Sequence, residues 1–209
     1  MSADTTWDQT DAAQVIAGNI TVPLGVTLTI EEGVVVKSQM VAFGGSYSYL
    51  SLIVEGTLNV NGTEDNPVVF TSTKDTTHGG KTNDSATPAA PGDWGSIKFQ
   101  EGSTGTVRNA QIYYASSAIL ATDSSPELTH CQLRNSSIGI QATGSSASPT
   151  ITLSSIVGNG QGAVAQSGAT INASENWWGA ADGPKGQGTG SGDSVSEGVD
   201  WSDPLTKEP

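Results

Sequence analysis

The sequence is poor in positive charge and has no long apolar segment. Lys and Arg supply 8 of its 209 residues, against 21 Asp and Glu, and the formal net charge is −13. Because Lys and Arg are the side chains that neutralise phosphate, we expect no nucleic-acid partner and no attraction to anionic membranes. No apolar run approaches the roughly 20 residues of a membrane-spanning helix, so we expect no membrane insertion.

Cysteine and histidine are scarce, which limits the available site chemistry. The one cysteine, Cys131, cannot form an internal disulfide, and Ala110 and Ser154 occupy the equivalent positions one repeat away. We interpret Cys131 as a small buried residue rather than a nucleophile. The two histidines, His78 and His130, have no Cys or His partner at metal-ligand spacing, which disfavours a zinc site.

What the sequence does contain is a repeat of short, strand-like segments. Apolar residues return at intervals of 20 to 24 residues, and Gly, Ser, Thr and Asn fill the gaps without helical periodicity. Two columns carry the pattern: Val107, Leu128 and Ile151, and, five residues later in each repeat, Ile112, Leu133 and Ile156. A return to the same side-chain type at this interval is typical of stacked coils. The sequence therefore predicts an all-β protein, a right-handed parallel β-helix (solenoid) with capped ends.

Two further features extend the predicted columns. Ile171 is expected to begin a fourth copy of the first column. A third column is expected in the gaps between the other two, made of Leu120, Ile140 and Val164. Together these aliphatic columns are predicted to form the core, each buried member contributing about 1.5–3 kcal/mol.

The chain is predicted to have three parts. Residues 1–19 are polar and are expected to cap the first coil, residues 20–178 form the coils, and residues 179–209 form a C-terminal tail or cap. Two segments, 38–49 and 72–92, interrupt the coils and are predicted to be loop insertions. A loop as long as the second is usually functional or mobile.

Four motifs together resemble a known kind of module. They are VTLTIEEGVVVK (26–37), SLIVEGTLNVNGTEDNPVVFTS (51–72), PGDWGSIKF (91–99) and ENWWGAADGP (175–184). In this order they resemble the right-handed parallel β-helix modules of large secreted or cell-surface, adhesin-like proteins, over nearly the whole chain. The resemblance implies a secreted or cell-surface location. Because this fold hosts unrelated activities, function has to be argued from the residues of a site.

The resemblance also implies a calcium-binding loop. Similar modules often carry an acidic loop of Asp, Gly and Asn between the FTS and PGDW motifs. Here Asp75, Asn83 and Asp84 keep that oxygen-ligand character, which suits calcium. Lys81 departs from the pattern, since a further acid is common at this place and an ammonium opposes a cation. Apart from this calcium site, no cofactor is expected.

The main functional interpretation is a non-catalytic structural or adhesive module, with cell-surface, assembly or polysaccharide partners. The sequence leaves an enzyme open as the alternative, because polysaccharide-degrading enzymes share the architecture. A hydrolase needs two facing carboxylates, which the outward positions of the central coils do not supply. A lyase needs a base and a positive charge, for which the candidates are Arg108, Tyr113 and Arg134.

A binding function would use exposed aromatic side chains as platforms for sugars. The residues predicted to bind such a ligand are Tyr47, Tyr49, Tyr113 and Arg134.

A lesser alternative is ice binding, which needs a flat, regular ladder of threonines. Thr27, Thr29 and Thr57 begin such a ladder, but Asn59 interrupts it and the later coils are not expected to continue it.

Overall fold

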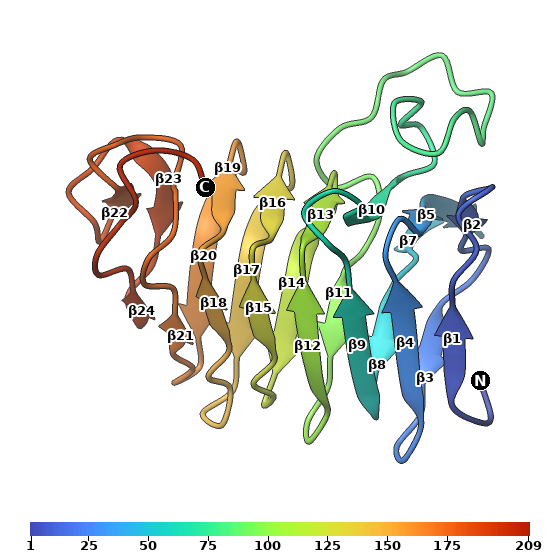
Figure 1. Ribbon diagram of the computed structural model, residues 1–209, viewed down its shortest axis with the longest axis horizontal. Helices are drawn as coiled ribbons and strands as arrows, with labels where there is room; N and C mark the ends of the chain where they lie inside the picture. Colours follow the sequence, from blue (N-terminus) through green and yellow to red (C-terminus); the bar gives the residue numbers. More distant parts are fainter.

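The computed structural model describes residues 1–209, except for the side chain of Phe43. The chain winds into a right-handed parallel β-helix whose coils stack along one axis, with the two termini toward opposite ends (Figure 1). Three parallel sheets form the sides, and the predicted fold class is confirmed. Across the described residues, no helix is long and apolar enough to span a membrane.

Each side of the helix is one sheet. Sheet A, which faces the viewer in Figure 1, has the strand order β1 (Thr5–Trp7), β4 (Thr27–Glu31), β9 (Thr57–Asn61), β12 (Thr104–Arg108), β15 (Glu127–Thr129), β18 (Thr150–Thr152), β21 (Ile171–Asn172) and β24 (Val199–Asp200). Sheet B has the order β2 (Gln14–Val15), β5 (Val35–Ser38), β10 (Val68–Ser72), β13 (Ala110–Tyr113), β16 (Gln132–Arg134) and β19 (Ser155–Val157). Sheet C has the order β3 (Ile20–Val22), β8 (Leu52–Val54), β11 (Ile97–Phe99), β14 (Ser117–Thr122), β17 (Ile138–Thr143), β20 (Gln161–Gln166), β23 (Gly192–Val195) and β22 (Pro184–Gly186).

The core consists of aliphatic columns that run along the axis. Strands pair in register from coil to coil, so each inward side chain lies directly on its equivalent in the next coil. The two columns through Leu128 and Leu133 are confirmed: Val107 pairs with Leu128 and Leu128 with Ile151, and the second column pairs in the same way. Leu133 is fully buried, and Leu128 is 2% exposed.

The third predicted column is wrong by one residue of register. Leu120 pairs with Gln141, which in turn pairs with Val164, whereas Ile140 pairs with Ile119 and Ala163. Because side chains alternate between faces, that single step turns Leu120 to the outer face while Ile140 points into the core.

The fourth copy of the first column is also displaced. Thr150 pairs with Asn172, and this register puts Ala173 rather than Ile171 beneath Ile151. Ala173 is fully buried. The column therefore carries a smaller side chain, that of Ala173, toward the C-terminal end of the stack.

The corner between sheets A and B is closed by side chains that bind the backbone of the preceding coil. The residue that makes the bend has a positive φ in successive coils, at Asn109, His130, Leu153 and Glu175. The residue after each bend points inward. Ser154 accepts the backbone N–H of Cys131 through Oγ at 2.9 Å, and Asn176 accepts that of Ser154 through Oδ1 at 2.9 Å.

The segments outside the central coils also carry strands. Within 1–19, β1 pairs with β4 and β2 pairs with β5, and within 179–209, β23 and β24 extend sheets C and A. The insertion at 38–49 is an antiparallel hairpin of β6 (Met40–Phe43) and β7 (Ser46–Tyr49). The insertion at 72–92 forms the irregular loop that rises above sheet B in Figure 1.

Replacing Leu133 with Asp should abolish cooperative folding. An unpaired charge in the aliphatic column costs several kcal/mol, against a typical total stability of about 5–15 kcal/mol. The measurement is thermal unfolding followed by far-UV circular dichroism. Leu24→Asp is the control, since Leu24 is 82% exposed and its replacement should leave the transition in place. Wild-type melting of Leu133→Asp would show that the column is misassigned.

Candidate functional site

The outer face of sheet B is where loops, tail and polar side chains meet. The 72–92 loop covers the part of this face over β5 and β10, through contacts of Lys37 and Thr71. The C-terminal tail crosses the part over β16 and β19. There Glu208 forms an ion pair with Arg134, and the Leu205 N–H donates to the carbonyl of Asn176 at 2.9 Å. The middle of the face lies between these two covers.

A buried lysine organises the 72–92 loop. Lys37 follows the inward Val36 in β5, so its side chain leaves the core and enters the space beneath the loop, where it is fully buried. Its ammonium donates to the backbone carbonyl of Asp75 at 2.6 Å and to that of Gly80. Burial lowers the pKa of Lys37, and the nearby Asp75 carboxylate opposes that shift.

Asp75 is the acceptor at the centre of the same network. Its carboxylate accepts hydrogen bonds from the Thr71 hydroxyl at 2.8 Å and the Thr77 backbone N–H at 2.8 Å, and lies 2.7 Å from His78 Nδ1. Burial alone would raise the pKa of Asp75, but the hydrogen bonds from His78, Thr71 and Thr77 outweigh it and hold the pKa below its ordinary value.

The three calcium candidates do not converge. Asp75 is buried in the network just described, whereas the Asp84 side chain is 98% exposed and pairs with Lys81. Asn83 directs its amide nitrogen to the Thr73 hydroxyl at 2.8 Å. The cation beneath this loop is the ammonium of Lys37, which the sequence pattern did not single out.

Tyr113 and Arg134 are neighbours, as predicted, but both are engaged. They pair in register on the outer face of sheet B. The His78 ring stacks on Tyr113 with a centroid distance of 5.0 Å, and Arg134 donates to Ser155 at 3.1 Å besides pairing with Glu208. Burial raises the pKa of Tyr113, against the opposing effect of Arg134.

Arg108 does not join them. It lies at the end of β12 in sheet A, where it pairs with Thr129 and lines a shallow depression beside Glu127. The three residues considered for a lyase are therefore divided between two faces of the helix.

A groove of about 350 Å³ lies at the corner of sheets A and B. Outward residues of three adjacent coils form its floor, corner residues form one side, and the C-terminal residue contributes to its wall. Its lining comprises Thr63, Glu64, Pro67, Asn109, Gln111, His130, Cys131, Gln132, Leu153, Ser155 and Pro209. Cys131 is buried, and burial raises the pKa of its thiol to about 12. It therefore packs in the core and does not act as a nucleophile.

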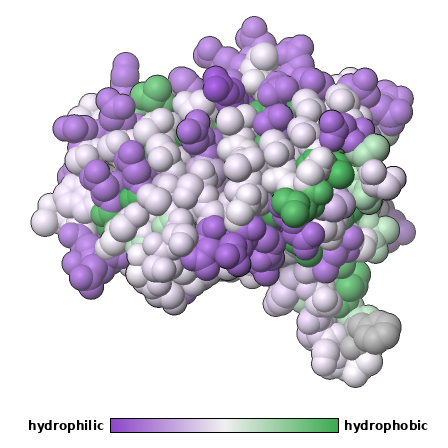
Figure 2. Space-filling model, turned by 90° about the horizontal axis from the view of Figure 1, so that it is seen from below, coloured by the Kyte–Doolittle hydropathy of each residue, from purple (hydrophilic) through white to green (hydrophobic). Residues whose placement is uncertain are grey.

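The β6–β7 hairpin projects from the body of the helix, at the lower right of Figure 2. Met40 pairs with Tyr49 and Ala42 with Tyr47, so these four residues share one face of the hairpin. Tyr47 is 68% exposed and Tyr49 is 46% exposed. The hairpin is rooted by the Leu50 N–H, which donates to Gln39, and by the Ser38 hydroxyl, which donates to Leu50. Two of the four predicted ligand-binding residues are thus freely presented.

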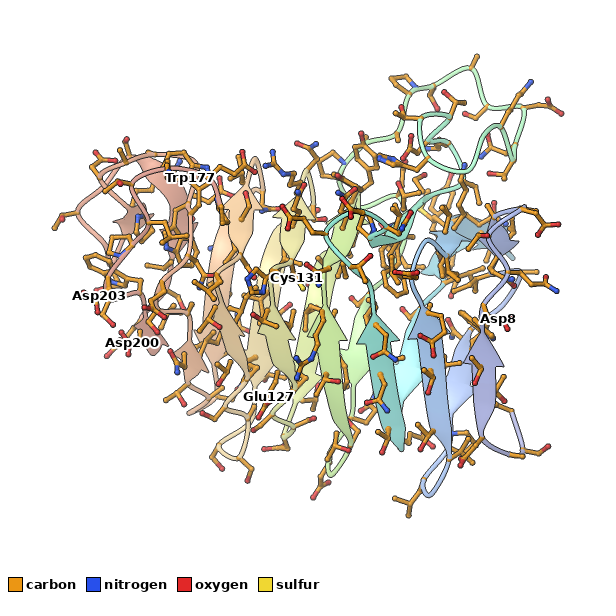
Figure 3. The ribbon with its side chains drawn as sticks, viewed as in Figure 1. Asp8, Glu127, Cys131, Trp177, Asp200 and Asp203 are labelled. Atoms are coloured by element: carbon orange, nitrogen blue, oxygen red, sulfur yellow. The ribbon has the colours of Figure 1, made fainter. Side chains whose placement is uncertain are left out.

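The threonine ladder on the outer face of sheet A extends further than predicted from the sequence. Thr57 pairs with Thr104, their hydroxyls 3.2 Å apart, and the later coils add Thr150 and Thr152. Charged side chains interrupt the array. Figure 3 shows Asp8, Glu127 and Asp200 spread along the length of the helix, so these carboxylates do not form a facing pair.

A comparison with protein families gives a match over the N-terminal part of the chain. Residues 1–95 match a model described as a pectate-lyase-like β-helix domain. The match covers the hairpin and the buried lysine, and it stops before the strands that carry Gln111, Gln132 and Arg134. No match was found among curated proteins or among solved structures. The likeness supports the parallel β-helix fold.

The fall in the free energy of unfolding at acid pH should depend on Asp75. Its pKa in the folded protein lies below the ordinary value of 3.8, so its stabilising effect is complete above that pH and is lost as the pH falls through the folded value. Asp75→Asn should lower the free energy of unfolding at neutral pH and flatten its decline in acid, measured by urea unfolding. Asp84→Asn is the matched control from the same loop. An unchanged fall at acid pH in Asp75→Asn would contradict the assignment.

Removing the Lys37 ammonium should loosen the 72–92 loop. Lys37→Met keeps most of the apolar stem but leaves the carbonyls of Asp75 and Gly80 without their donor, at a cost of about 1–3 kcal/mol for each unsatisfied group. Trypsin should then cleave after Lys74 or Lys81 faster than in the wild type.

A chelator should leave the wild-type melting temperature unchanged. A chelator-induced fall would instead show that calcium holds the loop.

Proposed function

We propose that this β-helix is a non-catalytic adhesive module, secreted or displayed at the cell surface, that binds a neutral polysaccharide through the β6–β7 hairpin. The observation that carries the proposal is the pair of exposed tyrosines on one face of the hairpin, Tyr47 and Tyr49. Tyrosine rings offer an apolar face for the C–H surface of a sugar and a hydroxyl for its polar edge.

The charge of the hairpin favours an uncharged ligand. Residues 39–50 contain no charged side chain, whereas the chain as a whole carries a formal charge of −13. A polyanion such as pectate would be repelled by that field, and a neutral polymer would not. The spacing of alternate residues on a strand, roughly 6.6 Å, lets the two rings engage successive sugars of one chain.

Binding without catalysis accounts better for the other polar residues. A lyase base works with a lowered pKa, but the pKa of Tyr113 is raised by burial and its ring is covered by His78. A hydrolase needs two facing carboxylates, and among the described side chains that line the groove Glu64 is the one carboxylate. The likeness to a pectate-lyase-like domain therefore supports an association with polysaccharide more than the lyase reaction.

Ice binding is supported less well. The threonines of sheet A form a ladder at Thr57 and Thr104, but Arg108 and Glu127 lie among the same strands. Charged side chains hold liquid water at the surface, which opposes contact with an ordered lattice.

The hairpin is tested by replacing both tyrosines with alanine. Retardation in affinity gel electrophoresis through galactomannan, xyloglucan or mixed-linkage glucan should weaken by at least about tenfold, as expected when aromatic anchors are removed. Ser46→Ala with Ser48→Ala, on the opposite face, is the control and should bind as the wild type does. The proposal fails if none of these neutral polymers retards the wild type, or if the tyrosine variant is retarded equally. Release of unsaturated or reducing sugars that is lost in Arg134→Ala would refute the non-catalytic part.

A further inference from the structure

The groove at the corner of sheets A and B has a floor of stacked hydrogen-bonding groups. Gln111 pairs in register with Gln132, and Gln132 pairs with Ser155. Neighbouring strands lie about 4.8 Å apart, so these side chains repeat along the groove at nearly the spacing of adjacent sugars in an extended glycan. The floor thus offers amide and hydroxyl groups at regular intervals.

Part of this hydrogen-bonding capacity is free. The carbonyl of the Gln111 side chain accepts the Tyr113 hydroxyl at 3.1 Å, which leaves the amide nitrogen available. Within the described part of the chain, the side chain of Gln132 has no hydrogen-bond partner. His130 stands at the rim with its Nδ1 3.0 Å from the Thr129 hydroxyl, so its other nitrogen is free to face a ligand. Amides and an imidazole of this kind recognise hydroxyl groups without requiring charge.

Leu153 is the apolar residue among the corner residues that make the bend between sheets A and B. It makes the corner bend with φ +50°, a conformation that Asn or Gly adopts with less strain, and Asn109 does so two coils earlier. Leu153 is also 37% exposed and lines the groove together with Pro67 and Pro209. The bend itself accounts for this backbone conformation, but the exposed leucine adds an apolar surface for a ligand to an otherwise largely polar groove.

We infer that this groove is a second binding site, for one end of a short neutral oligosaccharide. The class of ligand rests on the proposed function, but the site itself rests on residues that the hairpin does not share. Gln111 and Gln132 bind the sugar hydroxyls, and Leu153 contacts the apolar face of a pyranose ring. A volume of about 350 Å³ is near the lower end for small-molecule sites, so the groove holds a few sugar residues rather than a long chain.

The C-terminal residues complete the site. Pro209 lines the groove, and the ion pair of Glu208 with Arg134 fixes the tail against sheet B. Arg134 is therefore a positioning residue for this wall, acting through Glu208 rather than on the ligand.

The test uses the full chain labelled with ¹⁵N and titrated with short oligomers of glucose, xylose and mannose, from disaccharide to hexasaccharide. At least one series should shift the side-chain amide signals of Gln111 and Gln132. Leu153→Asn should weaken that binding by at least about tenfold, the loss expected when an apolar contact with the ligand is removed. Its melting temperature should equal or exceed that of the wild type, because Asn suits the bend better.

Leu24→Asn is the matched control, since it replaces another exposed leucine in a turn that does not line the groove, and its binding should match the wild type. The inference is overturned if no oligomer shifts the two amide signals, or if Leu153→Asn binds as tightly as the wild type. Failure here with polymer binding still dependent on Tyr47 and Tyr49 leaves the hairpin proposal intact. Groove binding without any effect of the two tyrosines would reject the hairpin proposal instead.

Discussion

In-register pairing between parallel strands of successive coils is the constraint on which the structure depends. It fixes which side chain lies on which, so the inward residues of successive strands build a continuous core along the axis. It also fixes the outer surface, because side chains alternate between the two faces. The glutamines of the groove and the threonines of sheet A are aligned by the same pairing that aligns Leu128 with Ile151.

The central coils could be predicted from the sequence because their repeats have few insertions. Val107, Leu128 and Ile151 recur at nearly constant spacing, and the structure confirms that they form one column. The prediction for Leu120 failed where two apolar residues are adjacent, Ile119 and Leu120, and the pattern alone does not say which one points inward. The hairpin was predicted only as an insertion, since its strands pair with each other and not with the repeat.

The candidate sites were predicted less well, for a physical reason. The resemblance implied that Asp75, Asn83 and Asp84 would bind calcium, and this stays a prediction. In the structure Asp75 is buried, the Asp84 side chain is exposed, and the ammonium of Lys37 donates to a backbone carbonyl of the loop. A lysine in a strand is ordinarily predicted to be exposed to solvent. Lys37 is buried because the 72–92 loop folds over it. In the same way, Leu153 looks like a column residue until the corner bend places it at the surface.

The corner side chains between sheets A and B give the solenoid a direction. The inward residue after the bend accepts a hydrogen bond from the equivalent backbone N–H of the coil before it. Ser154 accepts from Cys131, and Asn176 accepts from Ser154. A coil therefore depends on its successor for one backbone hydrogen bond. The side chain of Ala110 has no acceptor atom, so it cannot accept the equivalent N–H of the coil before it. A coil with an apolar corner residue, placed between the coils of Ser154 and Asn176, would leave the backbone N–H of Ser154 without its acceptor, so the coils of this helix are not interchangeable.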